Sequence, residues 1–303
     1  CLADVPGFQL TGPLKWWLKV RSLILLLLLT ACVKPRPDLY FAGSENKFSQ
    51  TEKMAFDGEA AIENSFIRVD GETYAFFDPN ATGAMKRRNM RTGETIQVLD
   101  SGARFSYVIE LGSMLLNFVT INGQIYKSRS LDGGLTWIDQ IKIQEAPMVQ
   151  WNPGVVIDAH GKWHMLIEAD ETGLPNQAGT GCYYYTSDDG STWTSRGRAI
   201  DKCGNPFLVA VSGGLLVIHG DISTGTWATT VSTFDGSRWQ KHRDRFEIGA
   251  NGVHVCDPHA IEDEGRILLS VSVDQNSITL TEANDSFEDL HRRLISHGSA
   301  GTF

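Results

Sequence analysis

Carboxylates at the ends of apolar stretches are the residues of this chain best suited to chemistry. Glu168 and Asp170 follow directly on an apolar run in "WHMLIEAD", and Asp78, Asp221 and Asp257 begin or end comparable stretches. Carboxyl groups that lie close together disfavour each other's ionisation, so one of them can keep its proton near neutral pH. A protonated and an ionised carboxyl group together provide the acid and the base or nucleophile that cleave a glycosidic bond. We therefore take Glu168, Asp78, Asp221 and Asp257 as candidate catalytic residues without separating their roles.

A second set of polar residues is expected to contact a substrate. Two of its members precede proline, which is also typical of a turn at the start of a strand. His259 suits either a metal ligand or a hydrogen-bonded histidine of a channel, and the second interpretation is favoured. We predict no metal ligands, although a structural calcium ion in a channel stays open. The expected substrate-binding residues are Glu63, Asn64, Arg87, Arg88, Asn152, Asp170, Asn205 and His259.

The elements that must position these residues are indicated by a turn that the chain repeats. The pattern hydroxyl, any, Asp, any, Gly, any, Thr, Trp occurs at 130–137 and again at 186–193, with weaker copies at 89–96, 232–239 and 280–287. Asp132 and Asp188 are expected to accept backbone N–H bonds across a tight turn, while Gly134 and Gly190 allow positive φ. The turn is therefore expected to be structural.

A second motif, strand–Gly turn–strand, recurs in phase with the first. Each of five units reads as strand A, turn, strand B, loop, strand C, the eight-residue turn and strand D. Five units of four antiparallel strands predict an all-β, five-bladed β-propeller over residues 51–303. A two-sheet sandwich is the alternative fold, but in such a fold we would not expect the eight-residue turn and the strand–Gly turn–strand motif to recur with the same period.

This topology separates two faces of the predicted propeller. The A–B and C–D turns share one face, whereas the starts of the A strands, the ends of the B strands and the B–C loops share the other. Acidic residues in A–B turns, such as Asp158 and Glu262, are therefore expected to be solvated surface groups. The candidate residues listed above fall on the second face, overhung by the long B–C loop at 169–181.

The N-terminal residues read as an export signal. Basic Lys19 and Arg21 precede an apolar run at 23–29, and the segment 29–32 resembles a bacterial lipobox that ends at Cys32. We expect 1–32 to be a signal region, of which 1–19 are translation artefact if Val20 is the start, and 33–50 to be a tether. An ordinary signal peptide is the alternative. Lipidation of Cys32 would anchor an exported protein to the bacterial cell envelope, in the periplasm or on the outer surface.

The net charge limits the kinds of binding partner that we expect, and the cysteine content bears on the cellular compartment. The net charge of −9 over 303 residues argues against a nucleic-acid partner. Export permits disulfides, so Cys182 and Cys203 are able to pair and leave Cys256 over, although three buried thiols fit the sequence equally well.

The repeated turn resembles the Asp box, or BNR repeat, of sialidases and other propeller proteins. The five blades, the "NP" and "DP" strand entries and "GKWHMLIE" are similar to five-bladed glycosidases of the arabinanase, xylosidase and fructosidase type. The resemblance implies a glycan substrate, no cofactor and carboxylates on innermost strands, and Asp257 matches such an Asp-Pro entry. Glu63 stands where those enzymes usually have an Asp base, and Asn205 replaces an acidic residue.

These departures leave a second function open. A non-catalytic propeller that binds glycan or protein through the same face is the alternative to a glycoside hydrolase. A sialidase-like exoglycosidase is a lesser alternative, because no arginine triad stands out and the chain is short for six blades.

Overall fold

The computed structural model describes residues 39–43, 47–54, 61–79, 82–100, 102, 104–143, 148–170, 179–274 and 277–296. The expected signal region at 1–32, with Cys32, lies outside these ranges, as do positions 33–38 of the expected tether. Within the described part of the chain, no helix has the length and apolar character that crossing a membrane would need.

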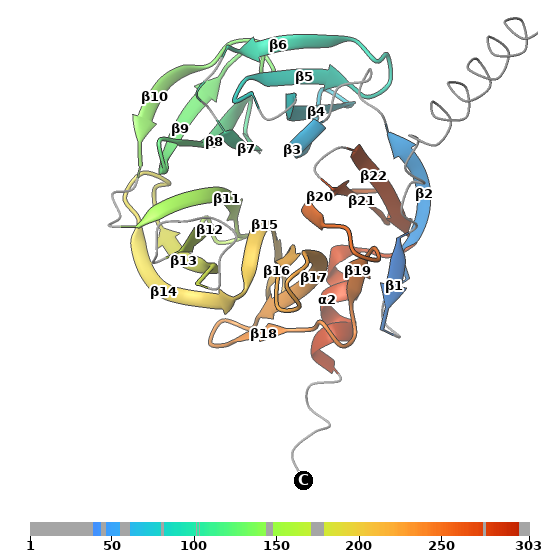
Figure 1. Cartoon of the computed structure of the whole chain (residues 1–303). Helices are drawn as coiled ribbons and strands as arrows, with labels where there is room; N and C mark the ends of the chain where they lie inside the picture. Colours follow the sequence, from blue (N-terminus) through green and yellow to red (C-terminus); the bar gives the residue numbers. More distant parts are fainter. Residues whose placement is uncertain are drawn as a thin grey trace, which may run out of the picture. The chain divides into compact units, whose positions relative to one another are not determined.

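Five antiparallel sheets stand around one axis, as Figure 1 shows, and the predicted five-bladed propeller is confirmed. Blade 1 contains β3 (Ala61–Val69), β4 (Glu72–Pro79), β5 (Met85–Asn89) and β6 (Thr95–Leu99). Blade 2 contains β7 (Arg104–Leu111), β8 (Met114–Ile121), β9 (Gln124–Ser130) and β10 (Ile138–Lys142). Blade 3 contains β11 (Val149–Ile157), β12 (Trp163–Asp170), β13 (Gly181–Ser187) and β14 (Thr194–Asp201). Blade 4 contains β15 (Cys203–Val211), β16 (Gly214–Asp221), β17 (Ala228–Phe234), β18 (Trp239–Lys241) and β19 (Glu247–Gly249). Blade 5 contains β20 (Val255–Asp263), β21 (Arg266–Val273), β22 (Ser277–Ala283) and β2 (Ser49–Met54).

The second strand of each blade is buried on both faces, and this burial accounts for the short apolar runs in the sequence. In β8, the side chains of Leu115, Leu116, Phe118 and Val119 are all 5% exposed or less. A strand that is buried on both faces reads as a continuous apolar run, because each blade packs between two neighbours. The core therefore lies between the blades.

The N-terminal end of the domain closes the ring. Strand β2 pairs antiparallel with β22 and supplies the outermost strand of blade 5, and β1 (Tyr40–Ala42) pairs with β19 of blade 4. The expected tether at 33–50 is therefore wrong for positions 40–42 and 49–50, which lie in strands. The pairing of β2 with β22 thus joins the beginning and the end of the propeller through backbone hydrogen bonds.

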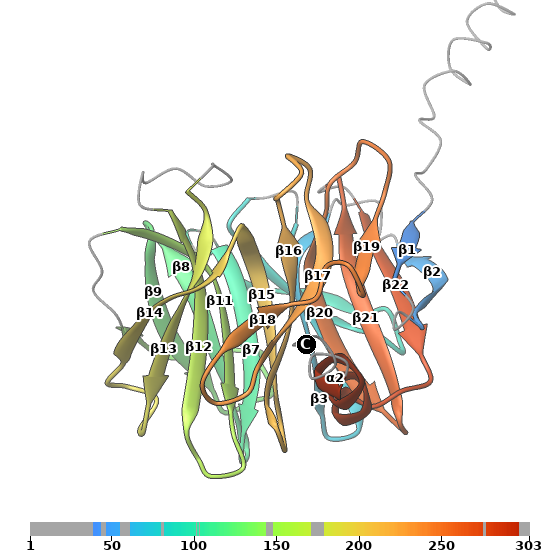
Figure 2. The ribbon, with the colours of Figure 1, turned by 90° about the horizontal axis from the view of Figure 1, so that it is seen from below.

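The segment after β22 forms helix α2 (Phe287–Ser296) in place of the fourth strand that the sequence predicted there. Ser286 caps the helix, since the Asp289 N–H donates to Ser286 Oγ (3.1 Å) and that hydroxyl donates to Asp289 Oδ2 (2.9 Å). The weaker copy of the repeated turn that the sequence indicated at 280–287 therefore leads into the start of a helix. In Figure 2 the helix lies beside blade 4, where the Ser212 N–H donates to Glu288 Oε1 (2.6 Å).

The C–D turns have the structural role that the sequence predicted, with one correction. Asp132 Oδ1 accepts the N–H groups of Leu135 (3.1 Å) and Thr136 (2.9 Å). In blade 3 the acceptor is Asp189, which bonds the N–H groups of Ser191 and Thr192, and not the predicted Asp188. The turn of blade 3 is one residue shorter than that of blade 2. The aspartate that accepts the backbone N–H groups therefore lies one position closer to the tryptophan in blade 3 than in blade 2.

The same shorter spacing appears in blade 4. Asp235, which stands one position later than the aspartate of the repeated pattern, accepts the N–H groups of Ser237 (2.9 Å) and Arg238 (2.8 Å). In blade 1, Asn89 Oδ1 takes the place of the carboxylate and accepts two backbone N–H groups. The turn therefore requires a short side-chain acceptor at its start and tolerates a change of one residue in length.

Candidate active site

Five backbone irregularities form a ring around the axis of the propeller. Each innermost strand carries a register shift against the second strand of its blade, so extra residues are inserted near its start. Such a β-bulge bends the strand and redirects a side chain. The first bulge residue of every blade has a left-handed backbone, and these residues are Glu63 (φ 55°), Phe105 (58°), Asn152 (43°), Asn205 (49°) and Asp257 (49°).

The local sequence explains three of the five bulges. Asn and Asp adopt positive φ more readily than other non-Gly residues, and they stand at the bulge in blades 3, 4 and 5. Each is followed by proline, which has no N–H to leave unpaired where the ladder is interrupted. The "NP" and "DP" pairs, which also suited simple strand-entry turns, mark the bulges. Glu63 and Phe105 give no such signal, and a left-handed backbone in a bulky residue is strained.

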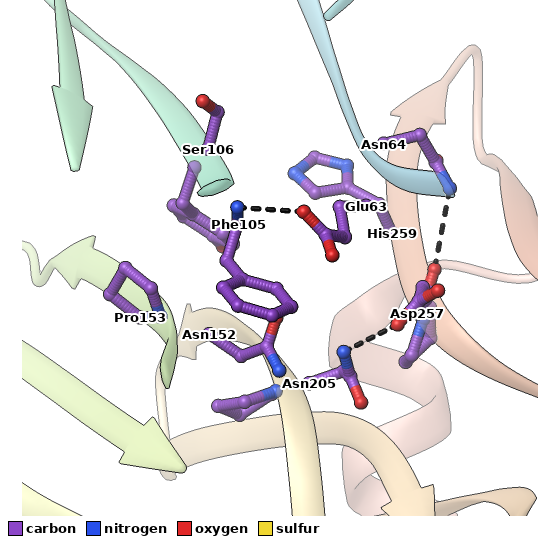
Figure 3. Close-up of a pocket in the computed structure, with 12 residues that line it drawn as sticks. Glu63, Asn64, Phe105, Ser106, Asn152, Pro153, Asn205, Asp257 and His259 are labelled. Carbon is purple, nitrogen blue, oxygen red and sulfur yellow. Dashed lines mark hydrogen bonds between the residues drawn. The ribbon is translucent and has the colours of Figure 1, made fainter. Parts of the chain in front are cut away.

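The ring encloses one pocket, shown in Figure 3. Its lining consists of the five bulge residues, the residue that follows each of them, and the side chains of Tyr107 and His259. The Phe105 ring projects into the space among the polar members. The cavity measures about 30 Å³, which is room for about two water molecules. Glu63 and Asp257 are its two carboxyl groups.

Glu63 is a buried acid with a raised pKa. Burial raises the pKa of Glu63 to about 8, the Arg104 guanidinium opposes that shift, and the neighbouring Asp257 charge adds to it. Its Oε1 accepts a bond from Arg104 (3.0 Å), and its Oε2 accepts the Phe105 N–H (2.8 Å). Glu63 therefore holds a proton at neutral pH.

Asp257 stands beside Glu63 and ionises at lower pH. Burial raises the pKa of Asp257 to about 6, although a bond from the Glu63 N–H favours the ionised form. Asn205 Nδ2 donates to Asp257 Oδ1, and Asn64 Nδ2 donates to the Asp257 carbonyl (3.4 Å). At pH 7 the pocket thus holds one protonated and one largely ionised carboxyl group.

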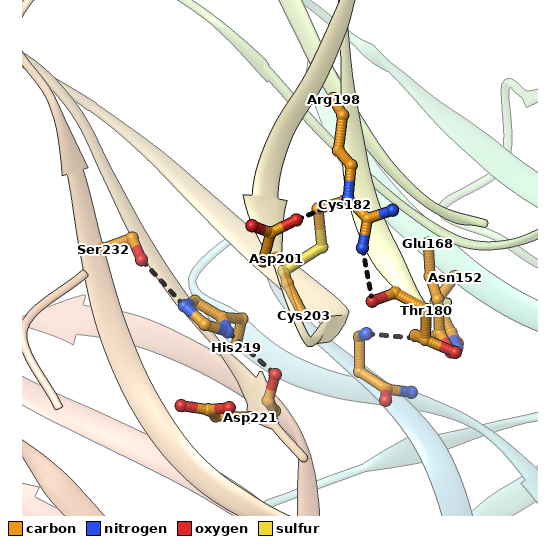
Figure 4. Close-up of a disulfide and its surroundings, with 12 residues drawn as sticks. Asn152, Glu168, Thr180, Cys182, Arg198, Asp201, Cys203, His219, Asp221 and Ser232 are labelled. Atoms are coloured by element: carbon orange, nitrogen blue, oxygen red, sulfur yellow. Dashed lines mark hydrogen bonds and ion pairs between the residues drawn. A yellow bond between two sulfur atoms is a disulfide. The ribbon is translucent and has the colours of Figure 1, made fainter. Parts of the chain in front are cut away.

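Glu168, the leading acid candidate from sequence, lies behind the ring and does not line the pocket. Its Oε2 accepts bonds from Asn152 Nδ2 (2.7 Å) and the Asn205 N–H (3.2 Å), as Figure 4 shows in part. Burial raises the pKa of Glu168 to about 7. A Cβ at Gly204 would meet Glu168 Oε2 at 2.6 Å, so only glycine lets this carboxyl group approach. Glu168 positions the two asparagines.

A disulfide lies next to this buried carboxyl group. Cys182 of β13 and Cys203 at the start of β15 are bonded, which answers the question that the sequence left open, and Cys256 is a buried free thiol. Cys182 is the direct cross-strand partner of Glu168. The bond links blade 3 to the strand entry that carries Asn205 (Figure 4), so it fixes one side of the ring.

His259 is the hydrogen-bonded channel histidine that the sequence favoured. The Phe66 N–H can only donate, so His259 Nδ1 accepts it (3.1 Å) and Nε2 carries the proton toward Ser65 Oγ (3.2 Å). Ser65 Oγ in turn accepts the Val108 N–H (3.0 Å). Burial lowers the pKa of His259 to about 3, so the ring stays neutral.

Carboxylates at the ends of the second strands anchor the B–C loops and do not line the pocket. Asp78 accepts the N–H groups of Thr82 (2.8 Å) and Gly83 (3.0 Å). Asp221 accepts the Ser223 N–H (2.8 Å) and lies 3.4 Å from Lys241 Nζ. Asp170 is fully buried and accepts the Thr180 hydroxyl (3.3 Å). A catalytic role for Asp78 and Asp221 and a substrate contact for Asp170 therefore stay predictions that the pocket lining does not support.

The arginine next to the pocket differs from the two that the sequence indicated. Arg87 and Arg88 lie within β5 and not in the B–C loop; the first stacks on Tyr74 at 3.6 Å and the second donates to Thr95. The cation at the ring is Arg104, which precedes the blade 2 bulge and pairs with Glu63. In the sequence, Arg104 could have been identified only from its position, which corresponds to the residue before the "NP" and "DP" pairs of the other blades.

Among the residues that the structure describes, no group of three or more His, Cys, Asp or Glu side chains is arranged to hold a metal ion. The structure thus adds no ligand cluster in support of a calcium ion in the channel. The polar side chains that line the pocket carry carboxyl, amide, hydroxyl and imidazole groups, and these suit proton transfer and hydrogen bonding to a polyhydroxylated ligand.

Solved structures share this architecture. A thermostable family-43 glycoside hydrolase superposes with a TM-score of 0.59 at 11% identity, covering 76% of this chain and 91% of that one. An endo-arabinase from Bacteroides thetaiotaomicron gives 0.58 at 13% identity, with coverage of 75% and 95%. An exo-1,5-alpha-L-arabinanase from a bovine ruminal metagenomic library gives 0.54 at 11%, with 75% and 94%.

These likenesses establish the fold, because the identities are too low to carry an activity from one chain to the other. No protein-family model and no curated protein matches the amino-acid sequence. The function must therefore be argued from the site.

Proposed function

We propose that the protein is a glycoside hydrolase whose acid and base are Glu63 and Asp257. The observation that carries this proposal is that the two carboxyl groups line one pocket with pKa values of about 8 and about 6. At neutral pH, Glu63 can protonate the leaving oxygen of a glycosidic bond while Asp257 acts as base or nucleophile. The fold shared with glycoside hydrolases supports a glycan as the substrate.

The other ring residues would bind and orient the sugar. Asn152, Asn205 and Asn64 supply amide groups beside the two acids, and Glu168 holds the first two in place. Because the Phe105 ring projects into the space among these groups, we expect its side chain to move when substrate enters.

A non-catalytic glycan-binding propeller is the second candidate. It is favoured by the asparagines at the bulges of blades 3 and 4, the places that Glu63 and Asp257 hold in blades 1 and 5. Binding needs hydrogen-bonding groups and no proton transfer.

Turnover of two substrate types separates these functions. We expect wild type to cleave arabino- or xylo-oligosaccharides and their 4-nitrophenyl glycosides with a bell-shaped pH profile whose limbs lie near pH 6 and pH 8. Glu63→Gln should lower turnover of the oligosaccharide about 100-fold or more. The loss on the 4-nitrophenyl glycoside should be smaller, because 4-nitrophenolate leaves without a proton.

Glu110→Gln is the matched control, since Glu110 is exposed on β7. Its turnover should equal that of wild type. Glycan binding without cleavage of any substrate in the panel would reject the hydrolase and support the binding protein. Equal losses on both substrates in Glu63→Gln would reject Glu63 as the general acid.

We also propose that the protein is exported and lipid-anchored through Cys32, as the lipobox resemblance indicates. The Cys182–Cys203 disulfide supports an oxidising compartment. Mass spectrometry of the mature protein from bacterial membranes should find a diacylglyceryl group on Cys32, and Cys32→Ser should abolish it. A mature N-terminus at any other residue would contradict this proposal.

A further inference from the structure

A second cavity lies between blades 3 and 4, away from the axial pocket. We call it the blade 3–4 groove, and it measures about 530 Å³, within the usual range for small-molecule sites. Its residues come from the A–B turn and strands β12, β13 and β14 of blade 3 and from the C–D turn of blade 4 with its flanking strands, and none of them lines the axial pocket. The lining includes Lys162, His164, Tyr184, Arg196, Phe234 and Trp239.

Three aromatic rings form one wall of the groove. Phe234 and Trp239 are stacked with their centroids 4.7 Å apart, and Tyr184 meets Trp239 edge-on at 5.3 Å. Phe234 and Trp239 are only partly buried, so part of this wall is open to a ligand. An aromatic surface of this kind suits the apolar C–H face of a sugar ring.

The Tyr184 hydroxyl is fixed by a chain of hydrogen bonds. Tyr184 Oη lies 2.6 Å from His164 Nδ1, and His164 Nε2 lies 3.1 Å from Asp158 Oδ2. Because a carboxylate only accepts, His164 Nε2 donates to Asp158 and Nδ1 accepts the Tyr184 proton. The phenol oxygen therefore keeps its lone pairs for a donor on the ligand, such as a sugar hydroxyl.

The cations of the groove distinguish it from the equivalent space between blades 2 and 3. That neighbouring space is lined by Lys127 and Arg129 together with Asp139 and Asp189, and Arg129 pairs with Asp139 at 2.6 Å. The blade 3–4 groove is lined by Lys162, Arg196 and Arg198 without an acidic residue. The cations of the blade 3–4 groove pair with carboxylates that stand outside its lining, as Asp188 does with Lys162 and Asp201 with Arg198.

Arg196 is the cation available to a ligand. Lys162 and Arg198 are engaged by Asp188 and Asp201, both at 2.6 Å. Arg196 Nε donates to Thr186 Oγ1 (3.0 Å), and within the described part of the chain no carboxylate pairs with it. Its remaining N–H groups match the paired oxygens of a carboxylate.

We propose that the blade 3–4 groove binds a hexuronate, a sugar whose carboxylate pairs with Arg196 while its ring packs on Trp239. A hexuronate unit brings one carboxylate, which matches the one guanidinium of the groove that no carboxylate of the described residues engages. The groove would bind acidic units of a glycan at a distance from the catalytic pocket, and this inference stands whether or not that pocket is catalytic.

Calorimetric titration of the full mature chain with galacturonate and glucuronate tests the proposal. The dissociation constants for these acids should be at least tenfold lower than those for galactose and glucose. Arg196→Gln should raise the uronate constants at least tenfold, while Arg129→Gln, in the space between blades 2 and 3, should leave them unchanged. Asp257→Asn should also leave them unchanged, which separates this site from the axial pocket.

Thermal melts of each variant verify the fold, and Trp239→Phe provides a second probe that keeps an aromatic ring at the wall. Equal affinity for acidic and neutral sugars would overturn the proposal, as would unaltered uronate binding in Arg196→Gln. Sulfate that competes with galacturonate at equal concentration would show an adventitious ion only and would also overturn it.

Discussion

The propeller uses carboxyl groups in two repeated places, and their surroundings give them opposite properties. In the C–D turns, burial opposes ionisation of Asp132, but the bonds from Thr136, Ser130 and Leu135 together outweigh it and lower the pKa of Asp132 to about 2. At the A-strand bulges, burial raises the pKa of Glu63 to about 8 and of Asp257 to about 6. Both places recur with the same blade repeat.

The difference teaches that the access of water and the neighbouring charges decide whether a carboxyl group stays ionised or keeps its proton. The turn aspartates are near the surface and accept several N–H and O–H groups, so they remain ionised and stabilise the turn. The bulge acids are deeply buried and lie close to each other, so protons stay bound near neutral pH even though donors such as Arg104 and Asn205 favour the ionised forms. A repeat can therefore place the same residue type in a structural and in a reactive setting.

The largest expected effect is on glycoside turnover, which should depend on a carboxyl group at the ring and not on one in a C–D turn. Asp257→Asn should lower glycoside turnover about 100-fold or more, because the ring then lacks its ionised group. Asp132→Asn should leave turnover within about twofold of wild type, since Asp132 lies in a turn on the opposite face. Steady-state kinetics on the same oligosaccharide compare the two, and a similar loss in both would remove the distinction between ring and turn.

The pH dependence of stability should differ in sign between the two settings. Glu63 has a folded pKa above its unfolded value of 4.5, so its stabilising contribution is complete below that value and is lost as pH rises toward about 8. Between pH 6 and 8 this loss amounts to about 2 kcal/mol in the free energy of unfolding. Urea unfolding of Glu63→Gln should therefore show a flatter profile over that range than wild type.

The turn carboxylates act in the opposite direction. The pKa of Asp189 is lowered to about 2 by bonds from the Thr192 and Ser191 N–H groups, so its contribution is present above about pH 4 and is lost as pH falls toward 2. Asp189→Asn should make the free energy of unfolding depend less on pH between about 2 and 4, and should leave its dependence between pH 6 and 8 unchanged. An alkaline effect of Asp189→Asn would contradict the assignment.

The smallest effect is expected on stability at pH 7. Asp132→Ala should lower the free energy of unfolding by roughly 1 kcal/mol, because it removes hydrogen bonds that are partly replaced by water at this exposed turn. Glu63→Gln should change it by less, since Glu63 is already mostly neutral at that pH. Chemical denaturation of both variants measures which of them loses more free energy of unfolding. A larger loss in Glu63→Gln would show that the ion pair with Arg104 stabilises the protein by more than burial of the Glu63 carboxyl group costs.

Much of the site followed from the sequence, and the failures have physical causes. Glu63, Asn64, Asn152, Asn205, Asp257 and His259 do meet around one pocket, because blade register alone places the A-strand entries together. Asp78, Asp170 and Asp221 satisfy the same register, but their carboxylates are used by the B–C loops, and hydrogen-bond partners distant in space cannot be read from position.

Phe105 and Arg104 were missed for a related reason. The bulge of blade 2 has no "NP" or "DP" pair, and a left-handed phenylalanine is held there by its neighbours against its own preference. Arg104 becomes part of the site only because blades 1 and 2 adjoin at the axis, where it pairs with Glu63.

By itself, the sequence determined the repeat, the five blades and the face on which the polar residues gather, because strand period and turn chemistry are local properties. The C-terminal limit of the repeat was misjudged, since a helix cap at Ser286 and the pairing of β2 with β22 replaced the expected last strand. Only the tertiary structure decided which carboxyl groups are buried together and keep their protons. Burial and pKa depend on neighbours from other blades, and those neighbours are fixed only when the ring closes.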